Sequence, residues 1–239
     1  MPLLVADRVS KFLPGEGRGD RERTILRDVS LTVPAGEVVA VWGRRRSGRS
    51  TLLRVLAGVE PPSEGTVTFD GVDLRRRPML GARGGIGYCH VVFARAIGET
   101  VLDQVAAPLL AGAMSRLQAE VCARRALRRV GALELAELRP DELDQFEALH
   151  VGIARGLVTD SRLLVLDEPT AGAYARVRDA VLDLLRSFAR EDGVAIVMAV
   201  EEAANLAGAD RALTIDRGEL HGERPVAPEP IVQLRDELA

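Results

Sequence analysis

Lysine is almost absent from this 239-residue sequence: Lys11 is the only one, so nearly all of the 32 basic residues are arginine. The sequence also has only two cysteines and three histidines. Two cysteines make no disulfide framework, and three scattered histidines suggest no metal cluster. Because 35 acidic residues offset the basic ones, the net charge of −3 provides no basic field, which disfavours nucleic acid as a partner.

Long apolar runs are absent as well. No run approaches the ~18 residues needed to span a bilayer, and residues 1–12 lack the charged start and long apolar stretch of a signal peptide. We therefore expect a cytoplasmic protein. A composition of 47% hydrophobic and 28% charged residues is ordinary for a soluble globular chain, and 239 residues suffice for one unit with a subdomain.

Apolar runs of strand length alternate with helical patterns over most of the chain. The runs typical of buried parallel strands lie at 37–42, 162–167 and 194–200, and helical periodicity occurs at 50–58, 100–157 and 175–191. A further strand is expected at 211–220. This alternation predicts an α/β fold with a parallel sheet and a helical insert. We assign one domain to residues 1–220 and a C-terminal extension to residues 221–239.

A glycine-bounded loop joins the first buried strand to a helical pattern. Gly43 and Gly48 are separated by four residues, and a basic residue and two hydroxyl residues follow, which is the Walker A spacing. Glycines let the backbone turn tightly around phosphate, and the amides at the start of a helix attract its charge. The candidate nucleotide-binding residues are Gly43, Arg44, Arg45, Arg46, Ser47, Gly48, Arg49, Ser50 and Thr51.

Two carboxylates follow the apolar strand that lies about 115 residues downstream. In P-loop enzymes an aspartate in this place holds Mg²⁺, and the glutamate after it can polarise a water molecule. Asp167 and Ser50 are therefore candidate Mg²⁺ ligands, and Glu168 is the candidate catalytic residue. A glycine turn or a strand-end carboxylate alone is commonly structural, but the two together in this order favour a nucleotide site.

With these motifs the sequence resembles the ATP-binding cassette (ABC) family, and it is similar to the subclass that serves lipoprotein-release and macrolide-export permeases. The resemblance is carried by "LRDVSLTVPAGEVVAVWG", "GIARGLVTDSRLLVLDEPTAG" and "ADRALTIDRGEL". It implies a P-loop NTPase fold, with a RecA-like core, an N-terminal antiparallel β-subdomain and a helical subdomain at about 92–155.

The resemblance also implies ligands and partners. ATP and Mg²⁺ would lie between the Walker loops of one chain and the signature motif of a second ABC subunit, in a homodimer or a heterodimer. A permease subunit would hold the assembly at the inner face of the cell membrane. Phe12 is the candidate for the aromatic residue that stacks on adenine, although ordinary packing is the interpretation that we favour for it.

Several residues depart from the family pattern where the family contacts ATP. Arg49 replaces the Walker lysine, Val91 the glutamine of the Q-loop, Tyr174 the aspartate of the D-loop, and Glu201 the switch histidine, while Arg46 replaces a glycine. In place of the Leu-Ser-Gly-Gly-Gln signature the chain has Leu143, Asp144, Gln145, Phe146 and Glu147. The aspartate would bring negative charge toward the partner's γ-phosphate, and the larger side chains would fill space that glycines leave open.

Two interpretations of the loop arginines remain open. The arginines could balance Asp167, Glu168 and Glu201 in an ion-pair network, or the three at 44–46 could form a solvated loop tip. We expect a degenerate subunit of a membrane ABC transporter, with weak or absent ATP hydrolysis and a structural or regulatory role beside a permease. The alternatives are an active ATPase that energises transport and a non-transport interaction protein that uses the ABC fold.

Overall fold

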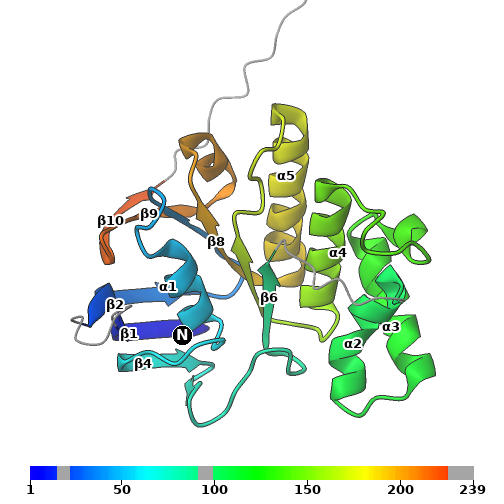
Figure 1. The fold of residues 1–239 in the computed structure, drawn as a ribbon, viewed down its shortest axis with the longest axis horizontal. Helices are drawn as coiled ribbons and strands as arrows, with labels where there is room; N and C mark the ends of the chain where they lie inside the picture. Colours follow the sequence, from blue (N-terminus) through cyan, green and yellow to red (C-terminus); the bar gives the residue numbers. More distant parts are fainter. Residues whose placement is uncertain (15–21, 91–98, 226–239) are drawn as a thin grey trace, which may run out of the picture.

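The computed structural model of the protein describes residues 1–14, 22–90 and 99–225 (Figure 1). The strands are β1 (Leu4–Leu13), β2 (Arg23–Val33), β3 (Val38–Trp42), β4 (Glu64–Phe69), β5 (Val72–Asp73), β6 (Ile86–His90), β7 (Leu163–Asp167), β8 (Ala195–Val200), β9 (Arg211–Asp216) and β10 (Glu219–Pro225). The α-helices are α1 (Arg49–Leu56), α2 (Val101–Ala111), α3 (Arg116–Arg129), α4 (Gln145–Leu157) and α5 (Ala175–Asp192), and two short 3₁₀ helices lie at Leu133–Leu135 and Ala203–Gly208.

A six-stranded sheet in the order β10-β9-β3-β8-β7-β6 forms the centre of the protein. Its strands run parallel, except for β10, which pairs antiparallel with β9. Along β7 the side chains alternate between the two faces, so Leu163 and Val165 enter one apolar cluster and Leu164 and Leu166 enter the other. Both faces are covered, which explains why the sequence of this strand is continuously apolar.

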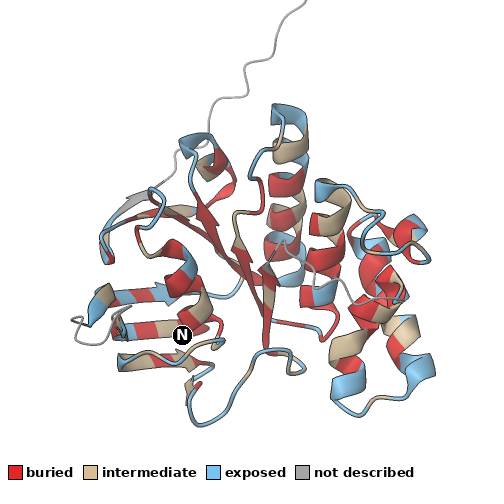
Figure 2. Ribbon diagram, in the orientation of Figure 1, coloured by how far each residue is buried: buried red, intermediate tan, exposed pale blue. Residues whose placement is uncertain are grey.

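Different elements cover the two faces of this sheet. Helices α2, α3, α4 and α5 contribute to one core cluster, and Figure 2 shows buried stretches along each of these helices. The other cluster combines α1 with an antiparallel sheet in the order β2-β1-β4-β5. The predicted α/β fold, with its antiparallel N-terminal sheet and helical insert, is confirmed.

The chain order fixes where the helices begin. Each of α1 and α5 follows a strand of the parallel sheet, and α4 ends only six residues before β7 begins, so all three helices start at the edge where the strands end (Figure 1). Backbone amides at the start of a helix carry partial positive charge. The candidate site residues at 43–51, 143–147 and 167–168 therefore belong to one edge of the protein.

Two boundaries differ from the sequence prediction. The stretch 211–220, expected as one strand, is a hairpin that turns at Arg217 and Gly218, both with positive φ. Its second strand, β10, continues to Pro225, so the boundary placed at residue 220 lies inside a strand. The start of the predicted helical subdomain, at 92–98, lies outside the described residues.

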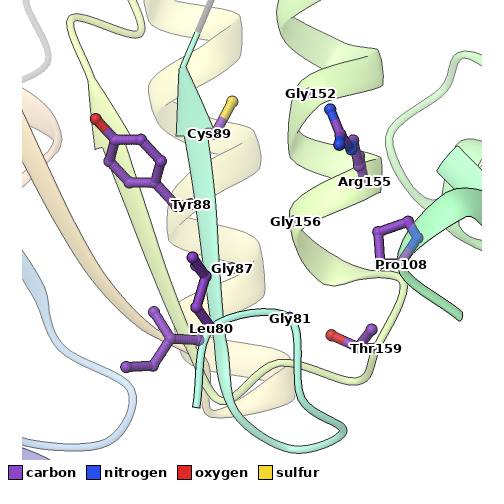
Figure 3. Close-up of a pocket in the computed structure, with 11 residues that line it drawn as sticks. Leu80, Gly81, Gly87, Tyr88, Cys89, Pro108, Gly152, Arg155, Gly156 and Thr159 are labelled. Carbon is purple, nitrogen blue, oxygen red and sulfur yellow. The ribbon is translucent and has the colours of Figure 1, made fainter. Parts of the chain in front are cut away.

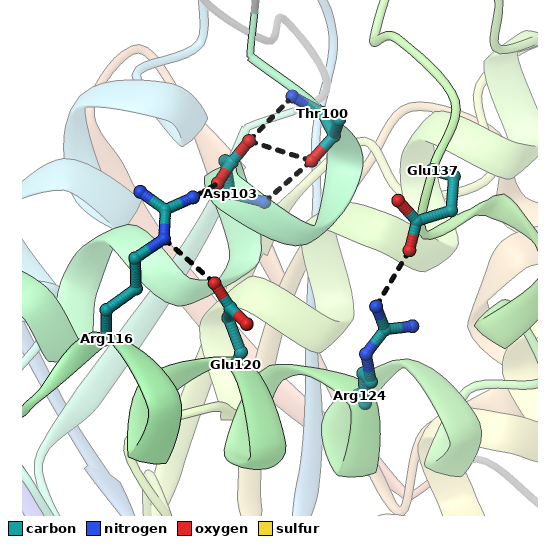
Figure 4. A network of polar contacts seen from close by, with 6 residues as sticks. All are labelled: Thr100, Asp103, Arg116, Glu120, Arg124 and Glu137. Carbon is teal, nitrogen blue, oxygen red and sulfur yellow. Dashed lines mark hydrogen bonds and ion pairs between the residues drawn. The ribbon is translucent and has the colours of Figure 1, made fainter.

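Polar contacts organise the start of the helical insert. The side chain of Thr100 accepts from the backbone amide of Asp103, whose carboxylate accepts from the Thr100 amide, and Arg116 pairs with Asp103 at 2.8 Å (Figure 4). These hydrogen bonds, together with the charge of Arg116, lower the pKa of Asp103 below its ordinary value.

No helix in the described part of the chain combines the length and apolar character needed to span a bilayer.

Candidate functional site

Backbone hydrogen bonds to β8 and to the turn between β9 and β10 hold the loop at 43–48 in place. The Gly43 amide donates to the carbonyl of Val200 at the end of β8, and the Gly218 amide donates to the carbonyl of Ser47. A Cβ on Gly43 would lie 2.5 Å from the carbonyl oxygen of Ile215, so only glycine fits there. The sequence analysis did not identify Gly218, whose own Cβ would lie 2.2 Å from the carbonyl oxygen of Ile25.

Gly48 is the N-cap of α1 and has φ 107°, a conformation suited to glycine. Since glycine has no side chain, it offers no capping group to the first amides of the helix, which lack partners within the helix. Amides at such a helix start are a ready site for phosphate. The backbone of the loop therefore fits the phosphate group that its spacing predicts.

Three arginines form the outer part of the loop. Arg44, Arg45 and Arg46 are exposed, and no ion pair joins any of them to a described residue. Arg46 has φ 64°, which lies in the left-handed region that favours glycine. For these three residues the solvated loop tip is the interpretation that the structure supports.

Arg49 behaves differently from the other three. Its side chain is 8% exposed, and its Nη1 atom lies 2.5 Å from Oε1 of Glu168. Its Nη2 atom lies 3.5 Å from Oε2 of Glu201. The residue at the lysine position thus pairs with the candidate catalytic residue and with the residue at the histidine position, as the ion-pair interpretation predicted for this one arginine.

The carboxylate of Glu168 is held on both sides. While Oε1 faces Arg49, Oε2 accepts a hydrogen bond of 3.2 Å from the backbone amide of Glu201. Burial raises the pKa of Glu168 above its ordinary value, although Arg49 and the Glu201 amide act in the opposite direction. The residue also has φ 54°, an uncommon conformation of the kind that recurs at functional sites.

Asp167 provides a place for a cation. Its Oδ1 atom is buried and has no hydrogen-bond partner among the described residues, and Ser50 lies exposed in the first turn of α1. A carboxylate and a hydroxyl are the oxygen ligands that Mg²⁺ prefers. The residues present therefore fit Mg²⁺ at Asp167 and Ser50.

The sequence analysis missed two aromatic residues of this region. Burial and the nearby charge of Asp167 raise the pKa of Tyr88, on β6, to about 12. Trp42, at the end of β3, donates from Nε1 to the carbonyl of Glu201 at 2.9 Å. The only available signal was position, since both residues lie on apolar strands that end at this edge.

In the signature stretch, residues 143–147, the backbone amides at the start of α4 already have side-chain partners from the same stretch. Asp144 is the N-cap of α4 and accepts from the amides of Phe146 and Glu147, while Glu147 accepts from the Asp144 amide. Gln145 donates to the carbonyl of Ala171, and Leu143 packs against the helical core. The start of α4 thus already carries a carboxylate, in contrast to the start of α1.

The remaining predicted residues take no part in the contacts described above. Tyr174 is the N-cap of α5 and is 82% exposed. Phe12 is half-buried and pairs with Thr24, next to Ile25, whose carbonyl oxygen lies close to Gly48. Thr51 is buried within α1. Val91 lies outside the described residues.

A pocket of about 300 Å³ lies on another part of the protein, between β6 and α4 (Figure 3). Cys89 points toward α4 and Tyr88 points to the opposite side of the strand (Figure 3). Gly87 and Gly156 are among the residues that line it, and a Cβ on Gly87 would lie 2.1 Å from the carbonyl oxygen of Gly156, so strand and helix pack backbone to backbone. Burial raises the pKa of the Cys89 thiol to about 12, which makes it unreactive.

Comparison with known proteins gives one consistent family. A family model described as ABC transporter matches residues 26–171. The lipoprotein-releasing system ATP-binding protein LolD of Bordetella pertussis is 34% identical over 224 residues, which cover 92% of this chain and 95% of LolD. The methionine import ATP-binding protein MetN of Rhizobium meliloti is also 34% identical, over 91% of this chain, but the chain spans only 62% of the length of MetN.

Solved structures share the fold. The dimeric structure of the bacterial ABC transporter cassette MJ0796 superposes with a TM-score of 0.82, at 23% identity, over 94% of this chain and 99% of that one. A post-hydrolysis state of the same cassette, bound to ADP and Pi, gives a TM-score of 0.80. The P-loop NTPase fold predicted from the sequence is confirmed.

Proposed function

Because the chain belongs to the family of ABC transporter ATP-binding proteins, we propose that it is a degenerate subunit of a membrane transporter, with weak or absent ATP hydrolysis. Its role beside the permease is structural or regulatory. The relatives LolD and MetN are ATP-binding proteins of a lipoprotein-releasing system and of methionine import, and the structural neighbour MJ0796 forms a dimer. These relatives support a permease and a second ATP-binding subunit as partners.

The observation that carries the proposal is the contact between Arg49 and Glu168. Hydrolysis needs a basic side chain on the phosphates and a carboxylate free to orient water. Here the Nη1 atom of Arg49 lies 2.5 Å from Oε1 of Glu168, and the other oxygen of this carboxylate accepts from the Glu201 amide. Both of these groups, the basic side chain and the carboxylate, are therefore engaged within the same chain.

Electrostatics opposes a triphosphate in this position. Two unit charges ~4 Å apart interact by about 4 kcal/mol at an effective dielectric constant of ~20, and 1.4 kcal/mol corresponds to a factor of ten in affinity. Glu201 is 47% exposed, which screens its charge, whereas Glu168 is only 25% exposed. Glu201 adds a carboxylate where the family has a histidine, and this added negative charge beside Glu168 would therefore weaken triphosphate binding by one or more decades.

The start of α4 supports the same conclusion. In the family arrangement this stretch faces the γ-phosphate across a dimer. Here the Asp144 carboxylate covers the amides of Phe146 and Glu147. A second copy of this chain would thus bring a negative charge to the site, so a homodimer would not restore hydrolysis.

Mg²⁺, when bound by Asp167 and Ser50, would neutralise phosphate charge. The chain's own residues would do the rest: Gly43 and Gly48 shape the loop, and the open amides of α1 bind phosphate. The intact backbone and the fit of Asp167 and Ser50 to Mg²⁺ favour retention of some nucleotide binding. Co-purification with a permease would separate the proposal from the alternative of a non-transport interaction protein that uses the ABC fold.

Steady-state phosphate release from Mg-ATP tests the proposal. The wild-type chain is compared with Glu168→Gln, which removes the candidate base, and with Glu202→Gln, a matched change at the exposed neighbour of Glu201. We expect the three proteins to release phosphate at the same rate. Release by the wild type clearly above that of Glu168→Gln would contradict the proposal and favour the alternative of an active ATPase.

A further inference from the structure

The phosphate loop is open at the start of α1 and closed toward the ends of β7 and β8. At the open end, Gly48 caps the helix without a side chain, and the three arginines at 44–46 are exposed around the loop. This part of the site offers backbone amides and positive charge. Both are groups that bind phosphate.

At the closed end the side chain of Arg49 joins α1 to the ends of β7 and β8. Arg49 is the first residue of α1, and its guanidinium contacts Glu168, which follows β7, and Glu201, which follows β8. The residues that it contacts are both acidic, and Arg49 itself is buried. A further phosphate on the side of α1 where β7 and β8 end would have to displace this guanidinium. It would then face the carboxylates of Glu168 and Glu201.

We propose that the loop binds a nucleoside diphosphate in preference to the corresponding triphosphate. This inference rests on the proposed function, because a site that hydrolyses ATP must first accept it. The diphosphate uses the loop amides and leaves the contact between Arg49 and Glu168 intact. The triphosphate adds negative charge on the side where Glu168 and Glu201 lie.

The two carboxylates are not equivalent in this argument. Glu168 is half-buried and held by two partners, so its carboxylate cannot move away easily. Glu201 is more exposed and lies 3.5 Å from Arg49, so its contribution is electrostatic rather than structural. Neutralising Glu201 should therefore relieve part of the discrimination without disturbing the fold.

Calorimetric titration of the full chain with ADP and with ATP, each in the presence of Mg²⁺, tests the inference. We expect ADP to bind at least tenfold more tightly than ATP. In Glu201→Gln the ratio should decrease because ATP binds better while ADP is nearly unaffected. Glu202→Gln is the matched control, since the same loss of one charge at the next residue should leave the ratio at its wild-type value.

Three results would overturn the inference. They are equal or tighter binding of ATP by the wild type, an unchanged ratio in Glu201→Gln, and no binding of ADP up to millimolar concentration. Phosphate release separates these failures from failure of the proposed function. Tight ATP binding without turnover contradicts only the preference for the diphosphate, whereas turnover above that of Glu168→Gln contradicts the proposed function itself.

Discussion

Removing the charge of Arg49 should destabilise the protein far more than removing that of a neighbouring arginine. In Arg49→Met the half-buried carboxylate of Glu168 loses its cation, and Glu201 loses the same partner. Breaking one side of a fully buried ion pair costs about 3–5 kcal/mol. Because Glu168 is 25% exposed, we expect a smaller loss of about 2–3 kcal/mol in the free energy of unfolding.

A double-mutant cycle isolates the contact. Glu168→Met alone should also destabilise, since it leaves the guanidinium of Arg49 buried without its closest partner. The double variant replaces both charges by apolar groups, so its loss should be smaller than the sum of the single losses by about 1–3 kcal/mol. Arg44→Met, on the exposed loop tip, is the control and should change stability by less than about 0.5 kcal/mol.

The assay is urea unfolding at neutral pH, followed by the fluorescence of Trp42, the only tryptophan. Thermal unfolding gives a second measure, since ~1 kcal/mol shifts Tm by about 2–4 °C in a chain of this size. Additive losses in the cycle would show that the two side chains do not interact. Equal effects of Arg49→Met and Arg44→Met would refute the reasoning as well.

Three further predictions concern the framework of the site. Asp103→Asn should lower the free energy of unfolding by about 1 kcal/mol at pH 7. Because the folded-state pKa of Asp103 is lowered, this loss should disappear as the pH falls below 3.8, the ordinary pKa of aspartate, and a loss that stays constant across pH would contradict the charge argument. Arg46→Gly should raise stability by up to about 1 kcal/mol in urea unfolding, since φ 64° suits glycine, and a loss would show that the side chain makes a stabilising contact. Gly87→Ala should destabilise by about 1–3 kcal/mol or more, because its Cβ would overlap the carbonyl of Gly156, whereas an unchanged Tm would mean that β6 and α4 separate easily.

The parts of the fold that could be predicted from the sequence are those with strong local patterns. The apolar runs of β3, β7 and β8 are buried on both faces, so their continuous hydrophobicity identified them. The loop at 43–48 was also predictable, because glycine spacing reflects backbone geometry. The hairpin of β9 and β10 was missed because its turn at Arg217 and Gly218 lacks the usual asparagine or aspartate before glycine.

The direction of long charged side chains could not be predicted. Arg46 and Arg49 lie only three residues apart, yet Arg49 is buried against carboxylates and Arg46 is exposed. The difference arises from β7 and β8, which are distant in the sequence and bring Glu168 and Glu201 to the start of α1. The closure of α4 had a local signal, since Asp144 and Glu147 have the spacing of a capping box.

The most direct test of the account is the state of the Arg49 guanidinium in solution. In ¹⁵N NMR of the arginine side chains, assigned by the loss of one signal in Arg49→Lys, Arg49 should show slow hydrogen exchange in the wild type and fast exchange in Glu168→Gln. Addition of Mg-ADP should leave the wild-type signal in place. Fast exchange of Arg49 in the wild type, equal to that of the exposed arginines, would contradict the claim that the site is closed by its own carboxylates.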